Sequence, residues 1–202
     1  MGLILGIGNE SGVGKDTFAM FLIDYLRSRK IKSLNIIREG FADRLYDLCF
    51  SFYSWAGFRT RQHYIINPAD KQVVLPLIGK CPRQMLIEYS NALNAVDPNF
   101  ALNAVVRDTT GFHLKIVPDV RRAWEFDALN NNPNAFLLRI TKPGVDSKWE
   151  MDQELKNPPY LEKWHETIAN DGDLSTLNNK AIEFAERIVL PRLYNHINTK
   201  TA

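Results

Sequence analysis

Short apolar runs alternate with stretches of helical spacing along most of the chain. The apolar runs predict strands at 3–7, 34–37, 114–117, 135–140 and 167–169. Apolar side chains three and four residues apart predict helices at about 14–29, 45–55, 82–96, 100–107, 124–129 and 177–195. Strands that alternate with helices are typical of an α/β domain with a parallel sheet flanked by helices. Pro191, within the last helix, predicts a kink or a local end.

We predict neither a strand nor a helix in two long stretches. The residues 57–79 are polar and predict a loop or a mobile excursion. The residues 141–163 are polar too and contain Pro143-Gly144 and Pro158-Pro159. This second stretch favours either a lid that closes over phosphates or a passive connection.

Composition bounds the class of protein. A chain of 202 residues, 45% apolar and 24% charged, is long enough for one α/β domain with insertions. Its net charge of +2 is too small to indicate a nucleic-acid partner. The first apolar run is too short for a signal peptide or a membrane span, and the two cysteines lack metal-site spacing. We therefore expect a cytoplasmic protein without a membrane or nucleic-acid partner.

The sequence GIGNESGVGKDT at 6–17 lies between the first predicted strand and the first predicted helix. Strand, Gly-rich turn, lysine, hydroxyl residue and helix together are the layout of a phosphate-binding loop. Gly12 and Gly14, with Val13 between them, let the backbone bend so that N–H groups converge on an anion. The following helix adds the positive end of its dipole.

Lys15 would supply a cation for the outer phosphates of ATP, and Thr17 or Asp16 stands where Mg²⁺ would be approached. Two positions depart from the strict pattern G-x-x-x-x-G-K-[ST]. Asn9 stands where the pattern has its first Gly, and Asp16 stands where it has Ser or Thr. The alternative interpretation is a Gly-rich strand-to-helix turn with a surface lysine.

Charged residues also follow two other predicted strands. Asp43 and Arg44 lie at a strand-to-helix junction, and Asp119, Arg121 and Arg122 directly follow the strand 114–117. Ligands of parallel α/β sheets bind outside the carboxyl ends of the strands. An Asp there would hold Mg²⁺, and arginines would reach phosphoryl oxygens. The alternative is helix-capping aspartates beside surface arginines.

Several motifs follow one another in a single order over most of the chain. They are GVGKDT at 12–17, FADRL at 41–45, LPLIGKCPRQML at 75–86, DPNF at 97–100, PDVRRAWEFDAL at 118–129 and IANDGDLSTL at 168–177. With them the chain resembles the phage-type deoxynucleoside monophosphate kinases, a branch of the nucleoside monophosphate kinase group.

The resemblance implies a single P-loop kinase domain with three parts. A core would comprise about 1–40, 111–140 and 166–202, a helical acceptor-binding insertion about 41–110, and a short lid about 141–165. The implied reaction transfers the γ-phosphoryl group of ATP, with Mg²⁺, to a deoxynucleoside 5′-monophosphate in nucleotide biosynthesis. A phage-encoded enzyme would work in the cytoplasm of a host cell, as a monomer or a homodimer.

The resemblance also implies roles on the acceptor side of the reaction. Arg83 would bind the acceptor phosphate, and Asp43 and Arg44 would lie near the acceptor. Glu125 would orient an arginine or the acceptor sugar, and Arg122 would reach phosphoryl oxygens.

On the donor side, the resemblance implies that Asp119 and Arg121 would contact the metal and the transferring phosphoryl group. Lys15 would supply positive charge there as well. Asn170 and Gly172 would form the turn near the adenine.

The implied lid would contribute three cationic side chains, those of Arg139, Lys142 and Lys148. After Arg139 this stretch carries lysines but no arginine before Lys163. Lysine is a point charge that cannot grip a phosphate bidentately, which sets this lid apart from an arginine-bearing one.

Two other functions remain open from the sequence. The first is a P-loop kinase of another small acceptor, such as dephospho-coenzyme A, which would share the loop and the Asp-bearing strand. The second is a non-catalytic module that binds a nucleotide to switch partner binding. The arginines on the acceptor side favour a kinase, because phosphoryl transfer needs mainly positioning and cations.

Overall fold

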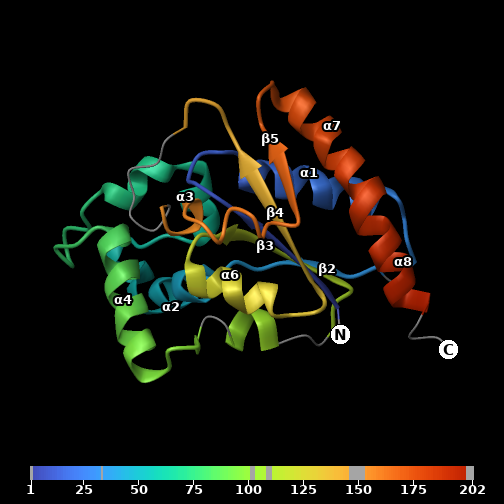
Figure 1. Cartoon of the computed structure of the whole chain (residues 1–202). Helices are drawn as coiled ribbons and strands as arrows, with labels where there is room; N and C mark the ends of the chain where they lie inside the picture. Colours follow the sequence, from blue (N-terminus) through green and yellow to red (C-terminus); the bar gives the residue numbers. More distant parts are fainter. Residues whose placement is uncertain (1, 33, 101–102, 108–110, 146–152, 199–202) are drawn as a thin grey trace. The chain divides into compact units, whose positions relative to one another are not determined.

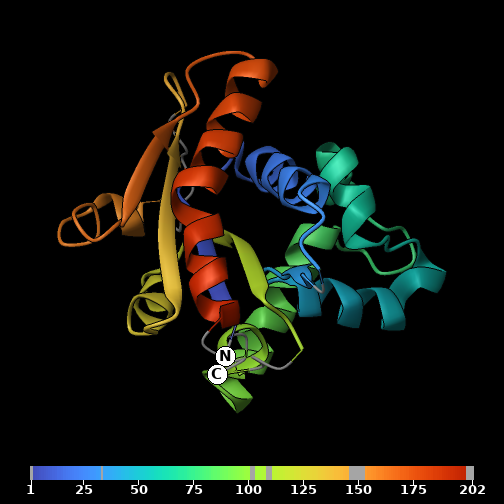
Figure 2. The same ribbon diagram turned by 90° about the vertical axis from the view of Figure 1, so that its right-hand side faces the viewer.

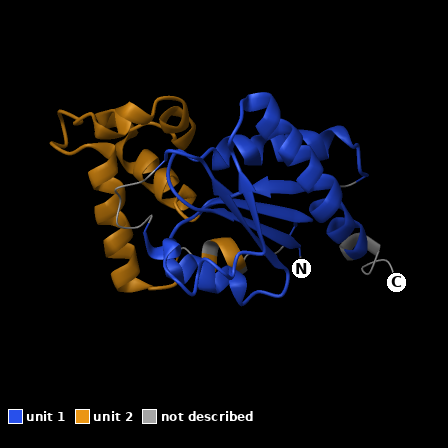
Figure 3. Ribbon diagram, turned by 45° about the horizontal axis from the view of Figure 1, so that its top comes forward, with its two compact units in different colours: residues 1–40, 108–202 blue, residues 41–107 orange. Residues whose placement is uncertain are grey.

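The computed structural model describes residues 2–32, 34–100, 103–107, 111–145 and 153–198. The chain divides into two compact units, which Figure 3 colours separately. Unit 1 comprises Met1–Gly40 with Asp108–Ala202, and unit 2 comprises Phe41–Arg107. The predicted lid range falls within unit 1. Each unit is described by itself below.

Unit 1 is built on a parallel sheet. Its strands are β1 (Leu3–Gly8), β2 (Ile36–Arg38), β3 (Leu114–Val120), β4 (Ala135–Thr141) and β5 (Glu166–Ala169), in the spatial order β2-β3-β1-β4-β5. Every neighbouring pair is parallel. The predicted α/β fold with a parallel sheet is therefore confirmed.

Helices cover both faces of this sheet (Figures 1 and 2). They are α1 (Lys15–Ser28), α6 (Ala123–Asn130), α7 (Leu174–Phe184) and α8 (Leu190–Asn198), with short turns η5 (Glu154–Lys156) and η6 (Ala185–Val189). Alternate residues of a strand point to opposite faces. Leu3, Leu5 and Ile7 of β1 accordingly join one apolar cluster with α1 and α7. Gly6 faces the other side, where a Cβ atom would lie 2.8 Å from Leu129 of α6.

The C-terminal helix is interrupted, as Pro191 predicted, but in a particular way. A π-helical turn, η6, separates α7 from α8 and ends two residues before Pro191. Proline has no N–H, and its ring clashes with the carbonyl four residues earlier in a regular α-helix. The wider π turn lies where that clash would fall. The helix also begins earlier than predicted, because the Asp173 side chain accepts a hydrogen bond from the N–H of Thr176.

Unit 2 is helical. Its elements are α2 (Asp43–Tyr53), η1 (Ser54–Ala56), α3 (Arg61–Ile66), η2 (Pro68–Gln72), α4 (Pro82–Val96) and the π-helical η3 (Asn103–Arg107). The unit has an apolar cluster of its own, formed by Tyr46, Cys49, Phe58, Tyr64, Leu75 and Met85.

The prediction of a loop at 57–79 is wrong for 61–66 and 68–72, which form α3 and η2, and it holds for the residues on either side. Phe58 and Tyr64 are buried, and their rings pack edge-on with centroids 5.4 Å apart. The Tyr64 hydroxyl accepts a hydrogen bond from the N–H of Arg59 at 3.0 Å. The elements here are so short that their few apolar residues never repeat at a helical period, which hid them from sequence analysis.

A buried ion pair lies where the chain leaves unit 1. The side chain of Lys115, in β3, is 1% exposed, and its Nζ lies 2.9 Å from a carboxylate oxygen of Glu39. The same ammonium lies 5.0 Å from the centre of the Phe112 ring. Glu39 lies just before the first boundary between the units, and Phe112 lies just after the second. Lys115 therefore contacts one residue near each of the two points where the chain passes from one unit to the other.

We expect Lys115→Met to lower the free energy of unfolding by about 3 kcal/mol, because it leaves the Glu39 carboxylate partly buried without its cation. Urea unfolding monitored by circular dichroism measures the change. Lys80→Met is the matched control, since Lys80 pairs with Glu88 on the surface and should change stability by less than about 1 kcal/mol. Equal effects of the two substitutions would contradict the structural role of the buried pair.

Candidate functional site

The loop 9–14 connects β1 to α1 at the carboxyl edge of the sheet. Its backbone has positive φ at Asn9 (107°), Gly12 (82°) and Gly14 (96°). Asn9 therefore adopts a backbone conformation that favours glycine, which is the residue of the strict pattern at this position. Its side chain donates a hydrogen bond to the carbonyl of Ile140 at 2.9 Å, and its N–H donates to the carbonyl of Val120 at 3.3 Å. Asn9 thus ties the start of the loop to β3 and β4.

Asn170 supports the other end of the same loop. Its amide nitrogen donates to the carbonyl of Val13 at 2.9 Å. A Cβ atom at Gly14 would lie 2.6 Å from this nitrogen, so the close approach requires glycine there. The sequence predicted Asn170 for a turn near adenine, and the structure shows a contact that the sequence did not indicate. Gly172, in the same turn, packs against Thr176.

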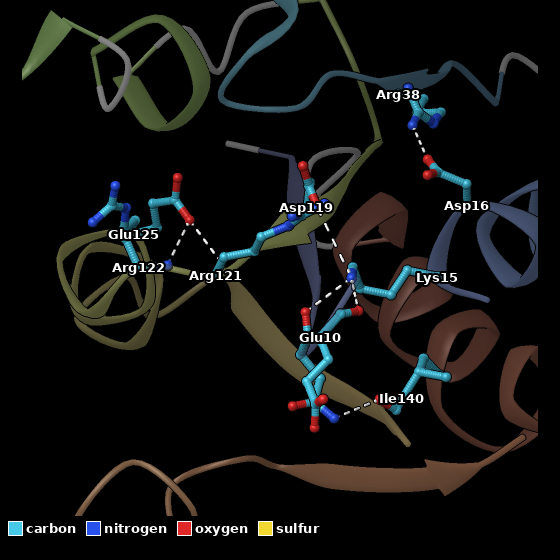
Figure 4. A network of polar contacts seen from close by, with 10 residues as sticks. Glu10, Lys15, Asp16, Arg38, Asp119, Arg121, Arg122, Glu125 and Ile140 are labelled. Carbon is cyan, nitrogen blue, oxygen red and sulfur yellow. Dashed lines mark hydrogen bonds and ion pairs between the residues drawn. The ribbon is translucent and has the colours of Figure 1, made fainter. Parts of the chain in front are cut away.

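Lys15 lies over the loop that precedes it (Figure 4). Its ammonium donates to the carbonyl of Asn9 at 2.8 Å and to the carbonyl of Glu10. It also lies 3.9 Å from a carboxylate oxygen of Asp119. Lys15 is 5% exposed, so the cation is held in place mainly by neutral carbonyl oxygens. A phosphate group would offer it a stronger, charge-assisted hydrogen bond.

Asp119 lies near Lys15, and Arg121 pairs with Asp119. The strand is longer than predicted, however: β3 runs to Val120, so Asp119 lies within the strand and not after it. The Arg121 Nε donates to the Asp119 carboxylate at 2.6 Å. One carboxylate and two cations, Lys15 and Arg121, therefore meet at this edge of the sheet.

Glu125 holds the turn that follows β3. One of its carboxylate oxygens accepts hydrogen bonds from the N–H groups of Arg121 at 2.7 Å and Arg122 at 2.9 Å. Burial raises the pKa of Glu125 to about 7, although those two hydrogen bonds and the charge of Arg121 oppose the shift. The resemblance gave Glu125 the role of orienting an arginine or the acceptor sugar, and in the structure its carboxylate binds the backbone N–H groups of two arginines.

Arg122 contacts a residue that the sequence analysis did not single out. Its guanidinium donates to the Glu154 carboxylate at 2.8 Å, and the N–H of Ala123 donates to the same carboxylate at 2.8 Å. Glu154 belongs to η5, in the second half of the predicted lid. No local signal in the sequence indicates this pairing, because the two residues lie 32 positions apart.

The described residues 153–165 of the predicted lid pack against the rest of unit 1. Leu155 is buried, and the Tyr160 hydroxyl donates to the Asp127 carboxylate at 3.1 Å. The Trp164 ring lies against Gly8, where a Cβ atom would be 2.3 Å from the ring. The structure therefore places 153–165 against the end of β1 and α6.

The predicted lid cations are placed differently from one another. Arg139 lies in β4 opposite Gly8. Its Nε is buried and has no hydrogen-bond partner among the residues that the structure describes. Burial lowers the pKa of Arg139, and the charge of Glu10 opposes that shift. Lys142 is exposed just after β4, and Lys148 lies outside the described residues.

Asp16 and Thr17 lie in the first turn of α1, which begins at Lys15. Asp16 forms an ion pair with Arg38, the last residue of β2. Arg38 was missed by the sequence analysis, although a basic residue at the carboxyl end of a parallel strand is a detectable signal. Thr17 is half-buried.

The predicted acceptor-binding residues belong to unit 2. Asp43 is the first residue of α2 and forms an ion pair with Arg61 of α3. Arg44 is exposed, and Arg83 is half-buried in the first turn of α4. Asp43 does not cap its helix, because the residue at that position is Ala42.

The oxygen ligands predicted for Mg²⁺ are those of Asp119, Asp16 and Thr17. Oxygen ligands suit this ion, which also keeps water and substrate phosphates in its shell. Within the described parts of the chain, no three His, Cys, Asp or Glu side chains gather in a way that could hold a metal ion.

The fold and this site define an α/β protein with a glycine-containing loop and a buried lysine at the carboxyl edge of a parallel sheet. No family model matches the chain, and no curated protein matches it. The chain is similar to a solved structure of dephospho-CoA kinase from Campylobacter jejuni, with 13% sequence identity, a TM-score of 0.43, and coverage of 93% of this chain and 98% of that one. The likeness is too remote to indicate a shared activity. Among the helices described, none combines the length and the apolar character that a membrane span requires.

We expect Glu125→Gln to remove a pH dependence of stability between pH 4.5 and pH 7. The folded protein holds the Glu125 proton up to about pH 7, whereas the unfolded chain releases it near its usual pKa of 4.5. The contribution of Glu125 to stability is therefore fully present below pH 4.5, and it falls by on the order of 3 kcal/mol as the pH rises to about 7. Glutamine stays neutral and keeps an oxygen that accepts from the two N–H groups.

Urea unfolding at a series of pH values tests this expectation. The wild type should lose more stability than the variant as the pH rises across the window. Glu88→Gln serves as the control, because Glu88 is 54% exposed. Parallel pH profiles for the wild type and Glu125→Gln would contradict the raised pKa.

We expect Asn9→Ala to destabilise the protein more than Asn9→Gly. Both substitutions remove the hydrogen bond to Ile140, which is worth about 1 kcal/mol. Alanine must also adopt a φ of 107°, which adds roughly 1–2 kcal/mol of strain. Thermal unfolding measures the difference. A glycine variant as unstable as the alanine variant would show that backbone strain at Asn9 is unimportant.

Proposed function

We propose that this protein is an ATP-dependent phosphotransferase that acts on a small phosphorylated acceptor, and that the acceptor is a deoxynucleoside 5′-monophosphate. One observation carries the first part: the 9–14 loop holds the Lys15 ammonium over its own backbone, with Asp119 and Arg121 beside it. The acceptor class follows from the motif resemblance, above all from the combination of P-R at 82–83, D-P-N at 97–99 and D-V-R-x-x-x-E at 119–125.

On the donor side, the triphosphate of ATP would bind at the 9–14 loop. Lys15 would exchange its carbonyl partners for phosphate oxygens, and Arg121 would turn from Asp119 to the transferring group. Asp119, Asp16 and Thr17 would hold Mg²⁺, which supplies charge neutralisation when it is bound. The transition state spreads negative charge over the transferred group, so these cations lower the barrier.

On the acceptor side, Arg83 would bind the monophosphate, with Asp43 and Arg44 nearby. The acceptor is already an ionised phosphate, so it needs no strong general base to become a nucleophile. Glu125 would act as a positioning residue, because it fixes the backbone that carries Arg121 and Arg122.

ADP release from Mg-ATP, with each common deoxynucleoside and ribonucleoside monophosphate supplied in turn, tests the proposal. Turnover that requires one or a few deoxynucleotides is expected. Turnover with dephospho-coenzyme A alone would support the phosphotransferase activity and contradict the proposed acceptor. Slow ADP release that ignores every acceptor would point to a nucleotide-binding module instead.

We expect Lys15→Ala to lower acceptor-dependent turnover by at least about 100-fold, because the transferred group loses its cation. Steady-state kinetics measures the loss, and circular dichroism checks that the fold is retained. Lys32→Ala, at an exposed position beyond α1, is the control and should leave turnover unchanged. Near-normal turnover of the folded Lys15 variant would contradict the proposed site.

A further inference from the structure

Glu10 places a carboxylate within the loop that is proposed to bind phosphates. Its backbone carbonyl accepts from Lys15, while its side chain points away from Lys15 (Figure 4). Glu10 is 7% exposed. A buried carboxylate beside an anion site repels the ligand unless a cation compensates it. The structure provides that cation.

Lys156 of η5 compensates Glu10. The Lys156 Nζ lies 3.1 Å from a Glu10 carboxylate oxygen. Lys156 lies two residues after Glu154, which binds Arg122 and the N–H of Ala123, and directly after the buried Leu155. Packed neighbours therefore hold the Lys156 backbone in place, so this lysine is positioned at the loop before any ligand arrives.

A second cation, Arg139, also feels the charge of Glu10. Arg139 stands opposite Gly8 in the sheet. Glu10 thus pairs with Lys156, and its charge also acts on Arg139. Cations gathered beside a loop of this kind suit an anion with several charges.

We propose that Lys156 binds the phosphates of the nucleotide held by the 9–14 loop, and that Glu10 is its counter-ion when no nucleotide is bound. The inference rests on the proposed function and goes further, because it assigns the phosphate contact to Lys156, whereas the sequence predicted Lys142 and Lys148. An ammonium can exchange a carboxylate oxygen for a phosphate oxygen with the same kind of charge-assisted hydrogen bond. A triphosphate carries more charge than one carboxylate, which favours the exchange.

A simpler role would also explain the ion pair: Lys156 could serve only to neutralise Glu10. The two roles differ once Glu10 has lost its charge. A lysine that only neutralises Glu10 is dispensable in a Glu10→Gln background. A lysine that binds phosphate is still required there.

Isothermal titration calorimetry of the full chain distinguishes the two roles, with ATP and inorganic tripolyphosphate as probes. The variants are Glu10→Gln, Lys156→Met and the double variant, with Lys163→Met as the control on an exposed lysine of the same segment. We expect Lys156→Met to weaken both ligands by roughly tenfold, the size of one charge-assisted hydrogen bond, in the wild type and in the Glu10→Gln background alike. Lys156→Arg should recover most of that affinity.

Equal affinities of Glu10→Gln and the double variant would overturn the inference and leave the proposed function intact. A wild-type protein that is folded but binds neither ATP nor tripolyphosphate would overturn both. Thermal unfolding of each variant shows whether a loss of affinity is a loss of fold.

Discussion

The Lys15 ammonium donates hydrogen bonds to the backbone of the 9–14 loop, and the arrangement of the site depends on this contact. The carbonyls of Asn9 and Glu10 accept hydrogen bonds from the cation, and Asn9 adopts a positive φ. That conformation is fixed from outside the loop, by the hydrogen bonds of Asn9 to β3 and β4 and of Asn170 to Val13. The sheet and the turn after β5 therefore shape the loop before a ligand binds, which lowers the cost of ordering it on binding.

Charge compensation is the second organising feature of the site. Carboxylates at the carboxyl edge of the sheet are paired with nearby cations: Asp119 with Arg121, Asp16 with Arg38, and Glu10 with Lys156. Such pairs contribute little to stability where they are exposed to water. They do keep several cations in place beside one loop, where phosphate oxygens can replace the carboxylates. This arrangement suits a ligand that brings several negative charges.

Each of the two units has an apolar cluster of its own. The strands of unit 1 bury one face against α1 and α7, and unit 2 packs its short helices around Tyr64 and its neighbours. The proposed donor residues all belong to unit 1, and the proposed acceptor residues Asp43, Arg44 and Arg83 belong to unit 2. Donor binding can therefore be altered by mutation without disturbing the core that carries the acceptor residues.

The sequence by itself determined the alternation of strands and helices and the loop with Lys15, because each follows from neighbouring residues. It put Asp119 after a strand, whereas β3 runs on to Val120 and includes it. It did not determine α3 or η2, whose apolar residues are too few to show a period. Nor did it reveal the pairs Glu10–Lys156, Arg122–Glu154 and Asp16–Arg38, or the support of Val13 by Asn170. These contacts join residues far apart in the chain, and only the packing of β5, η5 and β2 around the loop brings them together.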